Sequence, residues 1–284
     1  MVLLWLSCQL PSTVPVGMVR IPAGTFVMGR DASRHRDERP AHAVTLSAFS
    51  MDETLVTVAA FREFVEASGY VTSAEKRGSG KVSREGMADW DWEEVAGATW
   101  RTPWGPEGEF FPQEDHPAVQ VSWFDAVAYC AHYGKRLPTE AEWEYAMRAG
   151  SVGTRFPWGD SPTRPDGTIG LNFWQGESHA VNDRADGHLY LSPVKAFPPN
   201  AWGVYDPVGN VWQWVSDWYG EDTYEKDAAG VINPLGPASG TVRVGRGGSW
   251  WCSATACSGY GLHARGKTKP AASFANNGFR CAKQ

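Results

Sequence analysis

Glycine and proline recur so often in this sequence that it cannot form many long helices or strands. The 284 residues include 31 glycines and 19 prolines, which favour turns and interrupt regular elements. Fifteen tryptophans supply rings that bury about 150–250 Å² each, so a core can form between loops. Hydrophobic residues make up 42% and charged residues 20%, which is typical of a globular chain. No linker or repeat divides the sequence, and we therefore expect one domain.

Three segments have the apolar spacing and end signals of helices. The first spans about 57–68, the second begins at Ser122 and stops at Gly134, and the third is capped by Thr139 and Glu142 and ends at Gly150. Short strands are predicted at 18–21, 25–28, 43–49 and 243–245, whereas the polar stretch 75–114 is predicted to be a loop. The expected fold class is α+β, irregular and loop-rich.

The net charge of -6 and the pI of about 5.7 argue against a nucleic-acid partner, because such proteins usually carry a basic face. No run of about eighteen apolar residues is present, so the sequence predicts no transmembrane span.

Residues 1–16 precede the expected domain, which covers residues 17–284. The apolar run Met1–Leu6 is followed by Ser7 and Cys8, which resembles the end of a lipoprotein signal with Cys8 as the lipid anchor. This interpretation predicts an exported protein of the periplasm or cell envelope. An ordinary N-terminal extension on a cytoplasmic protein is the alternative, because the run is short and lacks opening basic residues.

Four of the five cysteines fall within the expected domain. A disulfide between Cys130 and Cys281 would close a loop of roughly 150 residues and contribute ~4–5 kcal/mol in an oxidising compartment. Two buried free thiols are the alternative. Cys252 and Cys257 follow a Gly-Gly-Ser turn and can bring both sulfurs to one point. Such a pair suits a reducible disulfide or a two-thiolate site for a soft ion such as monovalent copper; a plain structural disulfide is the alternative.

A series of motifs in a fixed order carries a family resemblance. They are PAGTFVMG at 22–29, ERPAH at 38–42, HPAV at 116–119, VSW at 121–123, GKRLPTEAEWE at 134–144, FPWG at 156–159, NFWQG at 172–176, VGNVW at 208–212, RGGS at 246–249 and GFRC at 278–281. From Gly17 onward the chain thereby resembles the formylglycine-generating enzyme (sulfatase-modifying factor) family.

This resemblance implies a fold distantly similar to C-type lectins and an oxidase that uses O2 and copper. Its substrate would be a cysteine in a Cys-x-Pro-x-Arg peptide or an unfolded sulfatase segment, which is converted to formylglycine. Carried over by motif, Cys252 and Cys257 are catalytic copper ligands and Ser249 lines the same pocket. Trp212, Arg265 and Asn276 line the substrate groove.

The resemblance also implies two structural calcium sites, whose mixed oxygen ligands suit this ion. The first comprises Asn172, the carbonyl of Phe173, Asp186 and the carbonyl of His188. The second comprises Asp206, the carbonyls of Gly209 and Val211, and Gln213, which stands where many relatives carry Glu. Two sets of turn-forming residues without metal are the alternative.

The sequence departs from the family pattern after the second cysteine. Gly259 and Gly261 replace two arginines of the usual run, and 269–272 (KPAA) replaces Thr-Pro-Asp-Ser. The lost polar groups could change peptide recognition, but both thiols are retained. Met147 and Leu262 stand where some relatives have a second disulfide, which apolar packing would replace.

Two other functions compete with the oxidase. One is a non-catalytic binding module in which Cys252–Cys257 is a disulfide. The other is an iron-dependent sulfoxide synthase with a related domain, but the seven histidines contain no His-x-x-x-His-x-Glu spacing.

Overall fold

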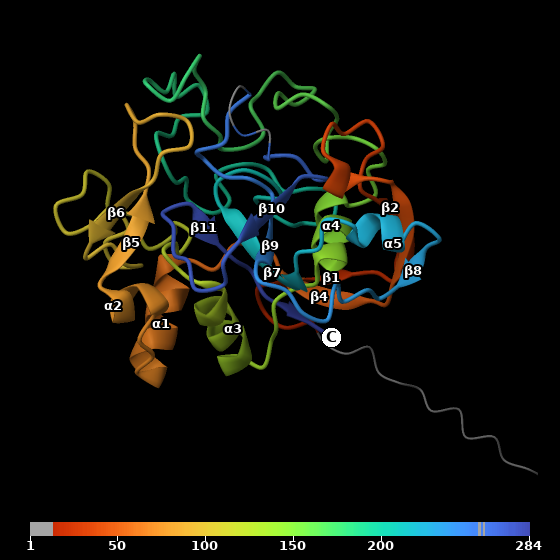
Figure 1. Cartoon of the computed structure of the whole chain (residues 1–284), viewed down its shortest axis with the longest axis horizontal. Coiled ribbons are helices and arrows are strands. Elements are labelled where there is room, and N and C mark those ends of the chain that lie inside the picture. The colour runs from red at the N-terminus through yellow and green to blue at the C-terminus, as the bar shows by residue number, and fades with distance from the viewer. Residues whose placement is uncertain (1–13, 255–256, 258) are drawn as a thin grey trace, which may run out of the picture.

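The computed structural model describes residues 14–254, 257 and 259–284, and within them short elements are joined by long loops (Figure 1). The helices are η1 (Arg36–Glu38), α1 (Val58–Ser68), α2 (Ser73–Arg77), α3 (Trp123–His132), α4 (Glu140–Arg148) and α5 (Thr223–Lys226). The strands are β1 (Met18–Ile21), β2 (Gly24–Met28), β3 (His42–Leu46), β4 (Phe49–Asp52), β5 (Ser79–Val82), β6 (Glu93–Ala96), β7 (Trp212–Trp218), β8 (Val231–Ile232), β9 (Arg243–Arg246), β10 (Arg265–Thr268), β11 (Asn277–Gly278) and β12 (Ala282–Lys283). This mixed, loop-rich single domain confirms the predicted fold class.

Four small sheets organise the strands. The largest has the order β10-β9-β7-β11, in which β7 is antiparallel to β9 and parallel to β11. The sheet β1-β4-β12 pairs the first strand and the last strand with opposite edges of β4, so both ends of the described chain belong to one sheet. The remaining sheets are β2-β3-β8 and β5-β6.

The three predicted helices form for the local reasons that the sequence supplies. The side chain of Thr57 accepts a hydrogen bond from the amide of Ala60, and Ser122 and Thr139 each close a full capping box at the start of α3 and α4. The helix α4 ends at Ala149 in the left-handed region (φ 46°), one residue before the predicted stop at Gly150.

Two expectations about strands need correction. The predicted strand at 43–49 is two strands, β3 and β4, which are separated by Ser47 and Ala48 and belong to different sheets. The predicted loop at 75–114 contains the antiparallel pair β5 and β6. Polar residues occupy both of these strands, so hydrophobic alternation does not reveal them.

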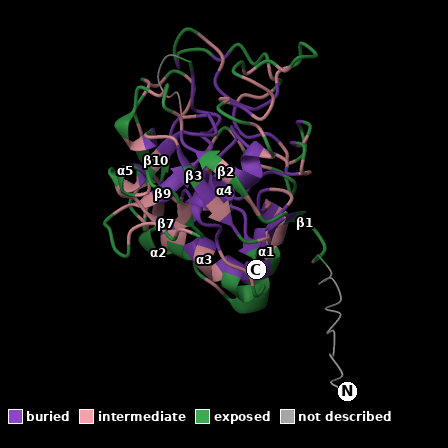
Figure 2. Ribbon diagram, turned by 90° about the vertical axis from the view of Figure 1, so that its right-hand side faces the viewer, coloured by how far each residue is buried: buried purple, intermediate pink, exposed green. Residues whose placement is uncertain are grey.

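Three hydrophobic clusters fill the interior, which Figure 2 shows as a buried centre surrounded by exposed loops. One of them contains Cys130 of α3 and Cys281, which the structure joins by a disulfide with Cα atoms 5.7 Å apart. In the described ranges no helix has the length and apolar character needed to cross a membrane.

Candidate functional site

A tight turn after β9 positions the cysteine pair. Gly247 and Gly248 both have positive φ (89° and 69°), and a Cβ atom on Gly248 would lie 2.5 Å from the backbone of Tyr260. Only glycine therefore allows the turn to approach the segment after Cys257. This approach brings the two cysteines together.

Cys252 and Cys257 are disulfide-bonded, and their Cα atoms lie 4.5 Å apart. Cys252 is buried with 1% of its surface exposed, whereas Cys257 is half-buried and lines a groove of about 710 Å³. The pair therefore has an inner sulfur in the core and an outer sulfur that a ligand in the groove can reach.

Ser249 lies behind the inner cysteine. Its Oγ atom is 3.9 Å from Sγ of Cys252, and it accepts hydrogen bonds from Nδ2 of Asn276 (2.9 Å) and from the amide of Trp251 (3.3 Å). The structure thus brings together Ser249, Asn276 and Cys252.

Aromatic and charged side chains both line the groove that contains Cys257. Trp90, Trp92, Trp212 and Phe274 line it, together with Asn276 and backbone of β10. Trp90 is 66% exposed. The sequence analysis missed Trp90 and Trp92 as groove residues because the segment that carries them is far from Cys257 in the chain.

The indole ring of Trp212 occupies the space that a side chain at Gly259 would need. A Cβ atom on Gly259 would lie 2.6 Å from both Cζ2 and Cη2 of Trp212 and 3.2 Å from Sγ of Cys257. Gly259 therefore allows the indole ring to approach the outer cysteine, so this departure from the family pattern has a direct steric consequence at the site.

Gly261, the second departure, lies beside two basic residues. A Cβ atom there would be 3.1 Å from Cγ of Arg155 and 3.2 Å from Cε1 of His263. The guanidinium carbon of Arg155 is 4.6 Å from the ring centroid of Tyr260. A guanidinium from another loop thus lies next to the position where relatives carry arginine.

Arg265 borders the groove, but its guanidinium is buried and engaged. It donates to both carboxylate oxygens of Glu140 (2.7 and 2.9 Å) and to the carbonyls of Asp37 and Gly220. Burial lowers the pKa of Arg265, but the charge of Glu140, the nearby Tyr224 and the hydrogen bond to Glu140 together outweigh burial, and the net shift is upward. Arg265 is therefore a charged support of the groove wall.

The first proposed calcium set converges on Asp186. Its carboxylate accepts from the amides of Phe173 (3.1 Å) and His188 (2.9 Å) and from Nε2 of Gln175 (2.6 Å). Burial raises the pKa of Asp186, which indicates a carboxylate short of positive charge. Asn172 donates to the carbonyl of Tyr190, and the oxygen-rich turn fits a hard cation.

The second set fits calcium only in part. Oδ2 of Asp206 is buried without a hydrogen-bond partner, and burial raises the pKa of Asp206 to about 6. Gly209, with φ of 77°, turns the chain toward Val211. However, Oε1 of Gln213 already accepts from Nε1 of Trp143 (2.9 Å) and Nε of Arg280 (2.8 Å), so Gln213 does not fit as a ligand in this arrangement.

The two sets are neighbours in space. The amide of Asn210 donates to the carbonyl of Asn172 (2.8 Å), and a Cβ atom on Gly209 would overlap that carbonyl. Within the described residues no group of three or more His, Cys, Asp or Glu side chains could hold a metal by itself, so calcium would depend on the carbonyl and amide oxygens.

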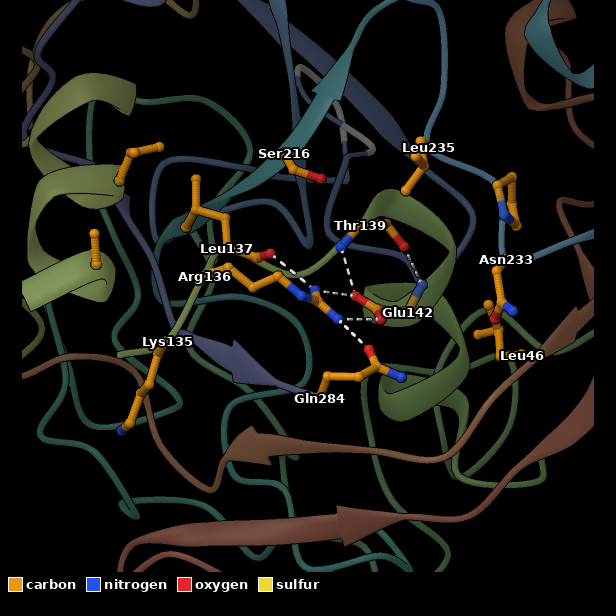
Figure 3. A pocket seen from close by; sticks show the side chains of 13 residues that line it. Leu46, Lys135, Arg136, Leu137, Thr139, Glu142, Ser216, Asn233, Leu235 and Gln284 are labelled. Carbon is orange, nitrogen blue, oxygen red and sulfur yellow. Dashed lines mark hydrogen bonds and ion pairs between the residues drawn. The ribbon is translucent and has the colours of Figure 1, made fainter. Parts of the chain in front are cut away.

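A second cavity of about 570 Å³ shares no lining residue with the groove. Figure 3 shows its lining, where Arg136 pairs with both carboxylate oxygens of Glu142 and donates to Gln284. None of the site residues predicted from the sequence lines it.

Comparison with known proteins places this chain in a family. Residues 8–284 match the family model of the sulfatase-modifying factor enzyme 1-like domain (FGE-sulfatase). The chain is 46% identical to a formylglycine-generating enzyme from Bos taurus, over 94% of this chain and 75% of that protein. It is also 40% identical to the "Inactive C-alpha-formylglycine-generating enzyme 2" of Mus musculus, over 99% of this chain and 91% of that protein.

The fold agrees with this match. The structure of PvdO from Pseudomonas aeruginosa superposes with a TM-score of 0.72 at 28% identity and covers 94% of both chains. The chain therefore belongs to the formylglycine-generating enzyme (sulfatase-modifying factor) family.

Proposed function

We propose that this protein oxidises a peptidyl cysteine to Cα-formylglycine and so matures sulfatases. The observation that carries the proposal is the position of Cys257 in the wall of a groove large enough for a peptide, with Cys252 and Ser249 directly behind it. Relatives named as formylglycine-generating enzymes, 46% identical in one case, support the same activity.

The net reaction determines which co-substrate, electrons and protons the site needs. A cysteine side chain, O2, two electrons and two protons give an aldehyde, one hydrogen sulfide and one water. The C–S bond breaks, the carbon is oxidised by two electrons, and O2 is reduced by four. The two additional electrons come from an external thiol reductant, which also opens the Cys252–Cys257 disulfide.

The reduced cysteine pair offers two soft thiolate ligands, which monovalent copper prefers. When bound, copper supplies the activation of O2 that protein side chains cannot provide. Cys252 and Cys257 would hold it, and the substrate thiol would reach it from the groove, next to Cys257.

The surrounding residues of the chain orient these groups. Asn276 holds Ser249 against Cys252, and Trp212 shields the outer sulfur from water on the side of Gly259. A peptide in the groove would pack its apolar side chains on Trp90, Trp92 and Phe274. Calcium at the Asp186 set would stabilise the loop that precedes this region.

We further propose export to an oxidising compartment, the periplasm or cell envelope. Two disulfides support this, because cytosolic thiols are normally kept reduced. The lipid attachment predicted at Cys8 lies outside the described residues.

A non-catalytic binding module is the second candidate. The disulfide between Cys252 and Cys257 and the similarity to a relative named inactive favour it. Such a module would bind peptide in the same groove without converting it.

A peptide assay separates the two. Protein reduced by a mild thiol and loaded with one equivalent of Cu(I) is mixed in air with a Cys-x-Pro-x-Arg peptide, and formylglycine is detected by mass spectrometry. The oxidase predicts conversion by the wild type and by the control Cys8→Ser, and none by Cys252→Ser or Cys257→Ser. Equal conversion by all four proteins, or by none, would contradict the proposal.

A further inference from the structure

His179 lies buried between two hydrogen-bond acceptors, with none of its side chain exposed. Its Nδ1 atom is 2.6 Å from Oδ1 of Asp89, and its Nε2 atom is 2.7 Å from the carbonyl oxygen of Trp251. Each ring nitrogen therefore lies within hydrogen-bond distance of an oxygen atom, and the imidazole is held from both sides. The geometry thus describes a fully buried imidazole fixed between the Asp89 side chain and the backbone at Trp251.

Aromatic rings enclose this imidazole. Its ring stacks on Trp251 with centroids 3.8 Å apart and an interplanar angle of 28°, and the ring centroid of Trp174 is 5.0 Å away. In addition, Nε1 of Trp251 donates to the carbonyl of Asp89 (3.1 Å), so Asp89, His179 and Trp251 are each hydrogen-bonded to the other two.

Asp89 and Trp251 each lie in a segment that forms part of the proposed site, and His179 links these two segments. Asp89 directly precedes Trp90 in the segment that lines the groove, and Trp251 directly precedes Cys252. The carbonyl of Cys252 accepts from the amide of Trp174, and the amide of Gly86 donates to the carbonyl of His179 (each 2.9 Å). Hydrogen bonds around His179 therefore hold three segments together, those of residues 86–92, 174–179 and 251–252.

We propose that His179 and Asp89 are a positioning pair that holds the Trp90/Trp92 segment against the Cys252 segment, and so sets the width of the substrate groove. This inference rests on the proposed function only for its effect on catalysis. Neither residue belongs to the motifs that carry the family resemblance.

The proposal is tested by Asp89→Ala, with Asp89→Asn as the conservative variant. The Asp89 side chain is 41% exposed, so its removal leaves the core packed. Asn retains a polar partner for His179, because its amide can donate to Nδ1 while Nε2–H still donates to Trp251. Asp115→Ala is the matched control, because it removes a surface Asp–His contact outside the groove, with Asp115 64% exposed.

Hydrogen exchange of the amides of residues 86–92 tests the positioning without any substrate. We expect Asp89→Ala to exchange about tenfold faster there, since the buried hydrogen bond to His179 is lost, and Asp89→Asn and Asp115→Ala to exchange like the wild type. Unchanged exchange in Asp89→Ala would overturn the proposal.

Kinetics with the Cys-x-Pro-x-Arg peptide tests the consequence. Asp89→Ala should raise KM about tenfold while kcat stays within about threefold, and Asp89→Asn should restore KM. A merely structural role would instead lower the active fraction, and so kcat, at unchanged KM; that result would overturn the positioning role. If the wild type converts no peptide, the proposed function fails, whereas the exchange experiment still decides the positioning.

Discussion

At Gly259 a single added methyl group should disturb the packing of Trp212 at the site. Because its Cβ would lie 2.6 Å from Trp212, Gly259→Ala should displace the indole ring and cost about 1–3 kcal/mol of stability. Urea unfolding measures this cost. In a Trp212→Phe background the two closest indole atoms are missing, so the same substitution should cost less than about 1 kcal/mol. Equal costs in the two backgrounds would show that Trp212 does not occupy this space.

Asp217 should make stability depend on pH. Its Oδ2 atom accepts from the amide of Glu140 and from Ser216, and burial, with Glu140 nearby, raises the pKa of Asp217 to about 7. The folded state therefore binds a proton more tightly than the unfolded state. The resulting stability is fully present below about pH 4 and is lost as the pH rises through about 7.

Asp217→Asn keeps an acceptor for Glu140 and cannot ionise. Between pH 5 and pH 8 the wild type should lose about 2–3 kcal/mol of unfolding free energy relative to this variant. Chemical denaturation at the two pH values measures the difference. Parallel pH profiles for the two proteins would contradict the raised pKa.

Among the elements, helices that carry their own capping residues could be predicted from the sequence. Strands that depend on pairing with distant segments could not. The helices α1, α3 and α4 carry their own caps, Thr57, Ser122 and Thr139, so the sequence was sufficient to locate them. The strand β7 at the centre of the largest sheet was missed, because its pattern WQWVSDW has little hydrophobic alternation and nearly every position is at least half-buried. This strand is stabilised by its pairing with β9 and β11, which lie far from it and follow it in the sequence.

The start of β7 is where calcium dependence should be adjustable. Gln213→Glu would keep the acceptor for Trp143 and Arg280 but place a second carboxylate oxygen where Nε2 now donates to the carbonyl of Asp206 (3.1 Å). Without metal this buried charge should destabilise the variant, and calcium should relieve it.

Calcium should therefore raise the Tm of Gln213→Glu by at least ~3 °C more than the Tm of the wild type, as measured by calorimetry. Magnesium, which fits such a site poorly, is the control. Equal shifts in the two proteins would show that residue 213 does not face a calcium site.

At the scale of the whole molecule, the disulfide between Cys130 and Cys281 should be a main source of stability. It spans 151 residues, and a loop of that length corresponds to about 4–5 kcal/mol in the chain-entropy model. The double variant Cys130→Ala/Cys281→Ala should lose that amount in urea unfolding under oxidising conditions, where the other pair stays intact. An unchanged midpoint would contradict this role.

The groove itself is also a property of the whole molecule. The sequence motifs indicated Cys252, Cys257, Ser249 and Asn276, because the family resemblance covers these positions. The groove walls come from segments more than 100 residues apart, such as Trp90 and Trp212. The contact between Asp89 and His179 likewise depends on tertiary packing, and no pattern in the sequence reveals it.

Titration of the mildly reduced protein with monovalent copper tests the central claim most directly, that Cys252 and Cys257 form a reducible metal site. Wild type, Cys252→Ser and Cys257→Ser are compared. We predict tight binding of one equivalent by the wild type and loss of that binding in both variants. A Cys252–Cys257 disulfide that resists mild reductant, or a reduced protein that binds no copper, would contradict the claim.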